Sequence, residues 1–198
     1  MSDDLVAFLR AIGAGEQALV GRLLGDGPEL VVAGLGRGEE VFLAECALQL
    51  YQGDTALHVA AAAYDTDLAR RLVDLGADLR ARNRRGGEPL HAATRGGPGS
   101  TGWDPARQRE TIGYLVGAGA DPNAAAAGGV TPLHRAVRNR CSGAVEALLQ
   151  LGADPRLAND SGSTAADLTR WTTGRGGSGS MEARAEQQRI VGLLGVSD

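Results

Sequence analysis

The chain has 198 residues, 43% of them hydrophobic, a formal net charge of −4 and two cysteines. This length and apolar content can bury a core, whereas two cysteines cannot form a disulfide framework. The sequence pI of about 5.4 argues against a nucleic-acid-binding surface. No apolar stretch is long enough to cross a membrane, and the acidic start MSDD is unlike a signal peptide. We therefore expect a cytoplasmic protein with no membrane and no nucleic-acid partner.

The first 51 residues predict a helical capping region. Residues 3–12 (DDLVAFLRAI) and 16–24 (EQALVGRLL) carry apolar side chains at helical spacing, which predicts two paired helices. Residues 39–51 (EEVFLAECALQLY) predict an additional helix that covers the first face of the stack that follows.

From residue 52 onwards, one motif recurs with a period of 33 residues, which is the signature of a repeat architecture. Its copies are GDTALHVAA at 53–61, GEPLHAA at 87–93, GVTPLHRAV at 129–137 and a divergent GSTAADLTR at 162–170. A second marker, Gly-Ala-Asp, ends at Asp78, Asp121 and Asp154, and its spacing shows that the second unit carries ten extra residues. Thr55, Thr131 and Thr164 predict helix starts.

The Thr-Pro-Leu-His and Gly-Ala-Asp motifs resemble those of the ankyrin repeat. The resemblance implies a β-turn and two antiparallel helices in each of four units, at about 52–84, 85–127, 128–160 and 161–195. We therefore predict an all-α ankyrin-repeat solenoid over 52–198, with an N-terminal helical cap over 1–51 that resembles a divergent first unit. The fourth unit departs from the pattern because Ala166-Asp167 replaces Leu-His, as is usual for a terminal repeat.

Two glycine-rich insertions lengthen the second and fourth units. RGGPGS at 95–100 and RGGSGS at 175–180 both lie within G-x-G-x-x-G patterns. A dinucleotide-binding loop also needs a preceding strand and a βαβ frame, which this helical pattern lacks. We therefore predict two turn extensions that could contact a partner, with Trp103 and Arg175 as their contact residues. A small anion or nucleotide bound between the two insertions is the alternative function.

No catalytic or metal-binding pattern is present. His58, His91 and His134 recur once per unit, so neighbouring imidazoles should stand about 10 Å apart. Zinc ligands must all lie about 2 Å from one metal ion. We expect each ring to bond to a neighbouring turn, and we expect no metal, no cofactor and no enzymatic activity.

The candidate partner-binding residues come from the ankyrin resemblance. In ankyrin-like stacks, partners are held by the turn tips and by the exposed face of each first helix. The matching positions here are Arg82, Arg84, Arg85, Arg95, Arg135, Arg138 and Trp171. Arginine and tryptophan are enriched at binding hot spots, and a cationic face attracts an acidic surface. The sequence thus predicts a monomeric, non-catalytic protein-protein interaction module, an adaptor or an inhibitor, whose partner is an acidic protein.

Overall fold

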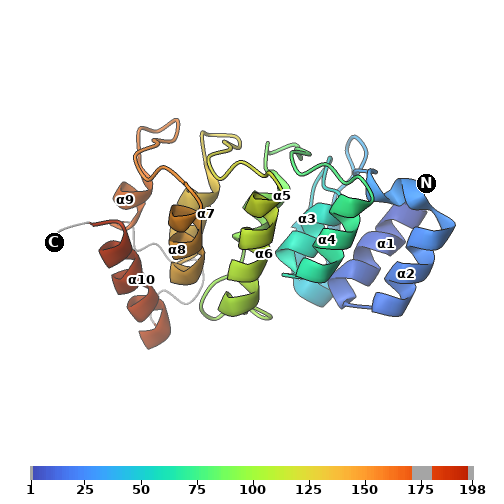
Figure 1. Ribbon diagram of the computed structural model, residues 1–198, viewed down its shortest axis with the longest axis horizontal. Helices are drawn as coiled ribbons and strands as arrows, with labels where there is room; N and C mark the ends of the chain where they lie inside the picture. Colours follow the sequence, from blue (N-terminus) through green and yellow to red (C-terminus); the bar gives the residue numbers. More distant parts are fainter. Residues whose placement is uncertain (1, 171–179, 196–198) are drawn as a thin grey trace.

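Helices stack in two layers along the long axis of the molecule, as the computed structural model of residues 2–170 and 180–195 shows (Figure 1). The first layer holds α3 (Ala56–Ala62), α5 (Pro89–Ala93), α7 (Pro132–Arg138) and α9 (Ala165–Leu168). The second holds α4 (Thr66–Asp74), α6 (Pro105–Gly117), α8 (Ser142–Gln150) and α10 (Met181–Leu193). Successive helices pack against one another within each layer. The predicted helical repeat solenoid is confirmed.

The first helix of each unit begins as its motif predicts. The Thr131 and Thr164 hydroxyls accept the backbone N–H of the third helical residue at the starts of α7 and α9, which pairs a donor that the helix itself leaves free. Pro89 and Pro132 occupy the first helical turn, where a missing N–H costs nothing. After α4, Gly76 takes a φ of 98°, a left-handed conformation that ends the helix at little cost for glycine.

The core lies between the two helical layers. The leucine of each histidine motif and its counterparts in the second layer are almost completely buried; they include Leu57, Leu72, Leu90, Leu115, Leu133 and Leu148. Each unit contributes a few such side chains and covers those of its neighbour. The core is therefore continuous along the stack, as a repeat fold requires.

The N-terminal region starts with two paired helices, α1 (Ser2–Ala14) and α2 (Gln17–Asp26), and a short 3₁₀ helix at Pro28–Val31. Helix α1 packs against both α2 and α3. Phe8, Leu9 and Ile12 of α1 are almost completely buried. It is therefore α1 that continues the first layer beyond α3 and covers its apolar face.

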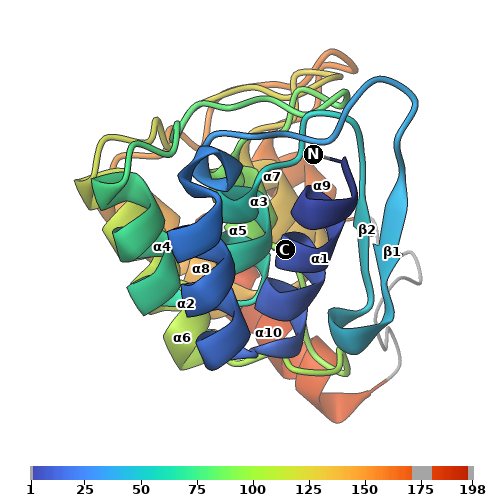
Figure 2. The same cartoon turned by 90° about the vertical axis from the view of Figure 1, so that its right-hand side faces the viewer.

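The additional helix predicted over 39–51 is wrong. This segment forms an antiparallel hairpin of β1 (Val41–Leu43) and β2 (Leu48–Leu50), joined by a 3₁₀ turn at Ala44–Cys46. Figure 2 shows the hairpin beside α1, and both β1 and the turn contact that helix. The alternation in Leu48-Gln49-Leu50 buries the two leucines. Burial of alternate side chains against α1 thus outweighs the helical propensity of Glu, Ala and Leu.

The first glycine-rich insertion lies between α5 and α6, as predicted. Residues 171–179, which contain most of the second insertion, lie outside the described residues, and so do Trp171 and Arg175. No helix within 2–170 and 180–195 combines the length and the apolar character that crossing a bilayer demands.

Candidate protein-binding groove

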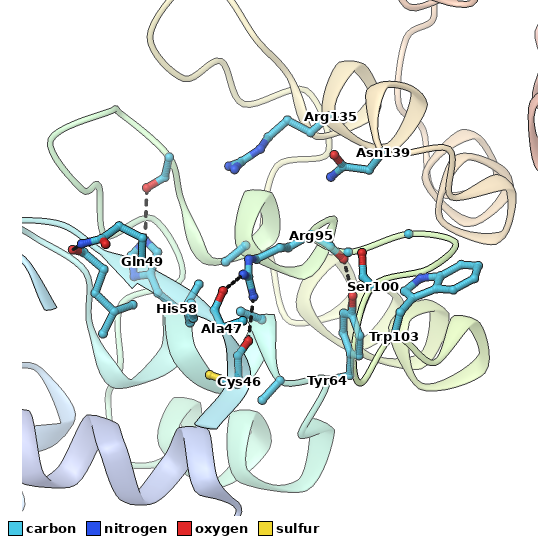
Figure 3. A pocket seen from close by; sticks show the side chains of 18 of the residues that line it. Cys46, Ala47, Gln49, His58, Tyr64, Arg95, Ser100, Trp103, Arg135 and Asn139 are labelled. Atoms are coloured by element: carbon cyan, nitrogen blue, oxygen red, sulfur yellow. Dashed lines mark hydrogen bonds between the residues drawn. The ribbon is translucent and has the colours of Figure 1, made fainter. Parts of the chain in front are cut away.

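A groove of about 1490 Å³ runs along the first-layer helices on the side of the hairpin (Figure 3). The hairpin lines one part of it, from Phe42 to Leu50, and the first insertion lines another, from Arg95 to Trp103. Residues of α3, α5 and α7 also line it, among them His58, Ala92 and Arg135. The groove therefore combines side chains from the N-terminal region and from three successive units, which is the arrangement of a binding surface on a repeat scaffold.

Arginines outnumber acids in the lining of this groove. The lining arginines of the described chain are Arg85, Arg95, Arg107, Arg135, Arg138 and Arg140, and the lining acids are Glu45, Asp54 and Glu88. Each of these acids is already engaged within the protein. Glu45 pairs with Arg10, and Glu88 with Arg82; Asp54 accepts hydrogen bonds from Asn83 and from the Tyr51 N–H. The groove thus keeps cationic groups that its own carboxylates do not neutralise.

Arg135 is one of the predicted contact residues that lie partly buried in the groove. Its side chain points from α7 into the groove (Figure 3). A Cβ placed on Gly87 would lie 3.7 Å from Arg135 Nη1, so the guanidinium reaches back across one unit of the stack. Burial, and then the charges of Arg138, Arg85 and Arg95, hold the pKa of Arg135 below its usual value. Like charges and desolvation both disfavour a protonated guanidinium. The attraction of a bound anion would offset this cost in free energy.

Two of the predicted arginines lie at the turn tip and are occupied by contacts within the protein. Arg82 donates from Nε to Glu88 Oε1 over 3.0 Å and pairs with the same oxygen through Nη2. Arg84 pairs with Glu40 and stacks on the Tyr51 ring, 4.8 Å from the ring centroid. Neither residue lines the groove in this structure.

Arg95 fastens the hairpin to the second unit. Its guanidinium donates to the backbone carbonyls of Cys46 and Ala47, as Figure 3 shows. Ala47 has a left-handed backbone with a φ of 50°, and a turn of this kind leaves carbonyls that need donors. The contact joins residues 48 positions apart in the chain, and it makes Arg95 a residue that shapes the groove.

Arg85 and Arg138 are exposed at the same groove. The Arg85 guanidinium lies 4.2 Å from the centroid of the Tyr51 ring, a cation–π contact that orients the side chain but leaves its N–H donors available. Neither arginine forms an ion pair with an acid in the described part of the chain. Together with Arg135, they are three groove-lining arginines without an acidic partner in the described part of the chain.

Trp103 holds the first insertion onto the scaffold. Its indole N–H donates to Gln108 Oε1 over 3.0 Å, and Gln108 Nε2 donates to the Ala93 and Arg95 carbonyls over 3.0 and 2.9 Å. Gln108 is completely buried in α6. Sequence reasoning missed Gln108, because one glutamine in a helix gives no local signal that it anchors a loop.

Phe42, Tyr51 and Arg140 also line the groove and were not predicted to do so. Phe42 is 54% exposed, although it is a large apolar side chain. Arg140 is only 6% exposed, and its backbone is left-handed with a φ of 57°. Phe42 and Tyr51 could not be placed from the sequence, because the hairpin that carries them was taken for a helix.

The histidines bond to neighbouring turns, as predicted. The Nε2 atoms of His58, His91 and His134 lie 3.0–3.1 Å from the carbonyl oxygens of Gly87, Val130 and Ser163, each at the entry to the following unit. Burial lowers the pKa of His58 and lowers that of His91 to about 4. Each ring thus joins its own helix start to the next unit.

Residues 2–170 and 180–195 contain no cluster of three or more His, Cys, Asp or Glu side chains placed to hold a metal ion. The alternative anion site needs both glycine-rich insertions. It includes Arg175, which lies outside the described residues, so that hypothesis stays a sequence-based prediction.

Comparison with known proteins agrees with this architecture. A family model described as ankyrin repeats (3 copies) matches residues 9–126, and a second, ankyrin repeats (many copies), matches residues 115–168. The chain belongs to the ankyrin repeat family. Repeats of this family are generally protein-protein interaction modules.

Two relatives illustrate how much of the chain is shared. The chain is 42% identical over 116 residues to ankyrin repeat and SOCS box protein 16 of Mus musculus, a match covering 57% of this chain and 24% of that protein. It is 36% identical over 113 residues to neurogenic locus notch homolog protein 1 of Danio rerio, covering 57% of this chain and 4% of that protein. The chain therefore spans a quarter or less of these relatives, and the likeness concerns the repeats.

Proposed function

We propose that this chain is a non-catalytic protein-binding module that holds an acidic partner protein in the arginine-lined groove. One observation carries the proposal: Arg85, Arg135 and Arg138 line a single groove and form no ion pair with a described residue, whereas each lining acid has a partner elsewhere, Glu88 through Oε1 alone. Complementary potentials increase the rate and specificity of association. Carboxylates of the partner would pair with these arginines.

The rigid scaffold supports the same proposal. Each unit is tied to the next by a buried histidine bond, and Arg95 ties the hairpin to the second unit. Side chains presented by such a scaffold lose little conformational entropy on binding. We propose that the protein acts as a cytoplasmic monomer, either as an adaptor or as an inhibitor that occupies its partner's functional surface.

Affinity capture from a lysate of the source cell tests this function. The bait is the wild-type chain, compared with Arg85→Glu/Arg138→Glu and with a control, Arg22→Glu/Arg184→Glu, that makes the same charge change outside the groove. An acidic protein retained by wild type and control, and released by moderate salt, is the expected result. Equal retention by all three baits would place the binding surface elsewhere. Circular dichroism of each variant checks that its fold is intact.

A further inference from the structure

Arg135 is a charged group that the protein itself leaves without an acid. It forms no ion pair with any described residue, and the acid that favours its charge, Asp54, is held by Asn83 and the Tyr51 N–H. Its neighbours include Arg138, Arg85 and Arg95. A half-buried guanidinium in such surroundings costs stability. The fold alone therefore supplies no compensating charge for Arg135 within the described residues.

A second arginine in the same groove has the same character. Arg140 is 6% exposed and lines the groove, yet it has no ion pair within the part of the chain that the structure describes. Guanidinium groups present several N–H donors in a plane and bind carboxylates in bidentate fashion. Two such groups in the lining, together with the exposed Arg85 and Arg138, favour an anionic ligand in the groove.

The walls of the groove restrict the shape of its ligand. The hairpin and the first insertion both contribute to the lining, and both are anchored, by Arg95 and by Gln108 respectively. We expect such walls to favour an extended segment over a flat protein surface. An extended segment can enter between them, and the exposed Phe42 ring offers it an apolar contact.

We infer that Arg135 is the centre of a carboxylate-binding subsite that takes an acidic side chain from an extended segment of the partner protein. This inference rests on the proposed function and narrows it from an acidic surface to an acidic peptide with an adjacent apolar residue. The charge of the groove and its walls select that occupant. The chain's own net charge of −4 makes a polyanionic nucleic acid a poorer match.

Fluorescence anisotropy with a labelled peptide tests the subsite. The probe is an unstructured glutamate-rich peptide with a central phenylalanine, and its control has glutamine in place of every glutamate. The proteins are wild type, Arg135→Gln, Arg135→Lys and, as a matched loss of one exposed charge, Arg184→Gln on α10. Inorganic phosphate and a single-stranded oligonucleotide serve as competitors, and melting temperatures are recorded for all four proteins.

We expect wild type and Arg184→Gln to bind the acidic peptide within twofold of each other and to ignore the glutamine peptide. Arg135→Gln should weaken binding about tenfold or more, as expected for the loss of a charge-assisted pair. Arg135→Lys should fall in between, because an ammonium cannot form the bidentate contact. The melting temperature of Arg135→Gln should be unchanged or higher, since an unpaired charge is removed from a partly buried site.

Several results would overturn the inference. If Arg135→Gln lowers the melting temperature by several degrees and leaves peptide affinity unchanged, Arg135 is structural. If Arg85→Glu/Arg138→Glu abolishes peptide binding but Arg135→Gln does not weaken it, the groove binds the peptide but Arg135 is not the centre of the subsite. If the oligonucleotide or phosphate displaces the labelled peptide at a lower concentration than the unlabelled peptide does, the groove does not prefer an acidic peptide and the inferred ligand is wrong. If wild type binds no peptide while capture still succeeds, the extended segment is wrong and the proposed function survives.

Discussion

Replacing Gln108 by methionine should detach the first insertion from the scaffold. Gln108 Nε2 donates to the Ala93 and Arg95 carbonyls over 3.0 and 2.9 Å, and Oε1 accepts the Trp103 indole N–H over 3.0 Å. Methionine keeps most of the volume and provides no donor. Arg95 O retains the Tyr64 hydroxyl, so the loss falls mainly on the Ala93 carbonyl and the indole. At about 1–3 kcal/mol for each buried group left unpaired, the expected cost for the two is about 2–6 kcal/mol.

Thermal and urea denaturation of Gln108→Met measure this cost. A chain of this size loses about 2–4 °C in melting temperature per kcal/mol, so the expected drop is about 4–24 °C. Hydrogen exchange should quicken over residues 95–104 and stay unchanged in α3. The matched control is Gln188→Met on α10, whose side chain is exposed and whose replacement should change little.

A small effect would refute this account of the loop. If Gln108→Met costs less than about 1 kcal/mol and exchange over 95–104 is unaltered, the insertion is held by its other contacts. These are the Cys141 thiol on the Gly96 carbonyl and the Asn139 amide on the Thr94 carbonyl. The anchored wall that we assign to the groove would then lose its main support.

Three further predictions follow from burial and backbone geometry. Burial lowers the pKa of His91 to about 4, so below about pH 6.5 the unfolded chain binds a proton at His91 that the folded chain excludes. As pH drops from 6.5 to 5, His91 alone should lower the unfolding free energy in urea curves by up to about 1.4 kcal/mol per pH unit, and His58 should act in the same direction. A flat profile would contradict the burial. Leu148→Ala in α8 should cost about 2–5 kcal/mol in the same assay, because the side chain is completely buried and leaves a cavity; an unchanged melting temperature would mean that the helix faces another way. Gly97→Ala should destabilise the fold, because its Cβ would lie 2.1 Å from the Asn139 carbonyl oxygen. Its control is Gly113→Ala in α6, where no atom lies within 4 Å of the new Cβ, and this substitution should raise the unfolding free energy by about 0.5–1 kcal/mol. Equal effects of the two substitutions would refute the contact.

The repeat architecture could be predicted from the sequence because its signals are local and recur. Each helix start is specified by a threonine or proline within a few residues of the histidine that bonds to the next unit. The 33-residue period then sets which helices are neighbours. Neither inference requires knowledge of a contact between distant residues, so both can be made from the sequence alone.

The partner-binding set could be predicted only in part, because a side chain's partners depend on what folds against it. Arg82, Arg84 and Arg95 carry the same chemistry as Arg135, yet Glu88, Glu40 and the Cys46 and Ala47 carbonyls engage them. These contacts range from six to 49 positions along the chain. Sequence spacing alone could not separate the engaged arginines from the available ones.

The sequence by itself determined the solenoid, the phase of its units and the role of the histidines, since each follows from short motifs and their period. Only the tertiary structure decided that residues 41–50 form a hairpin and that Gln108 anchors the first insertion. It also decided that Arg135 lies in a groove and forms no ion pair with a described residue. The physical reason is common to all three. Each depends on burial against elements far away in the chain, and burial outweighs the local preferences that a sequence displays.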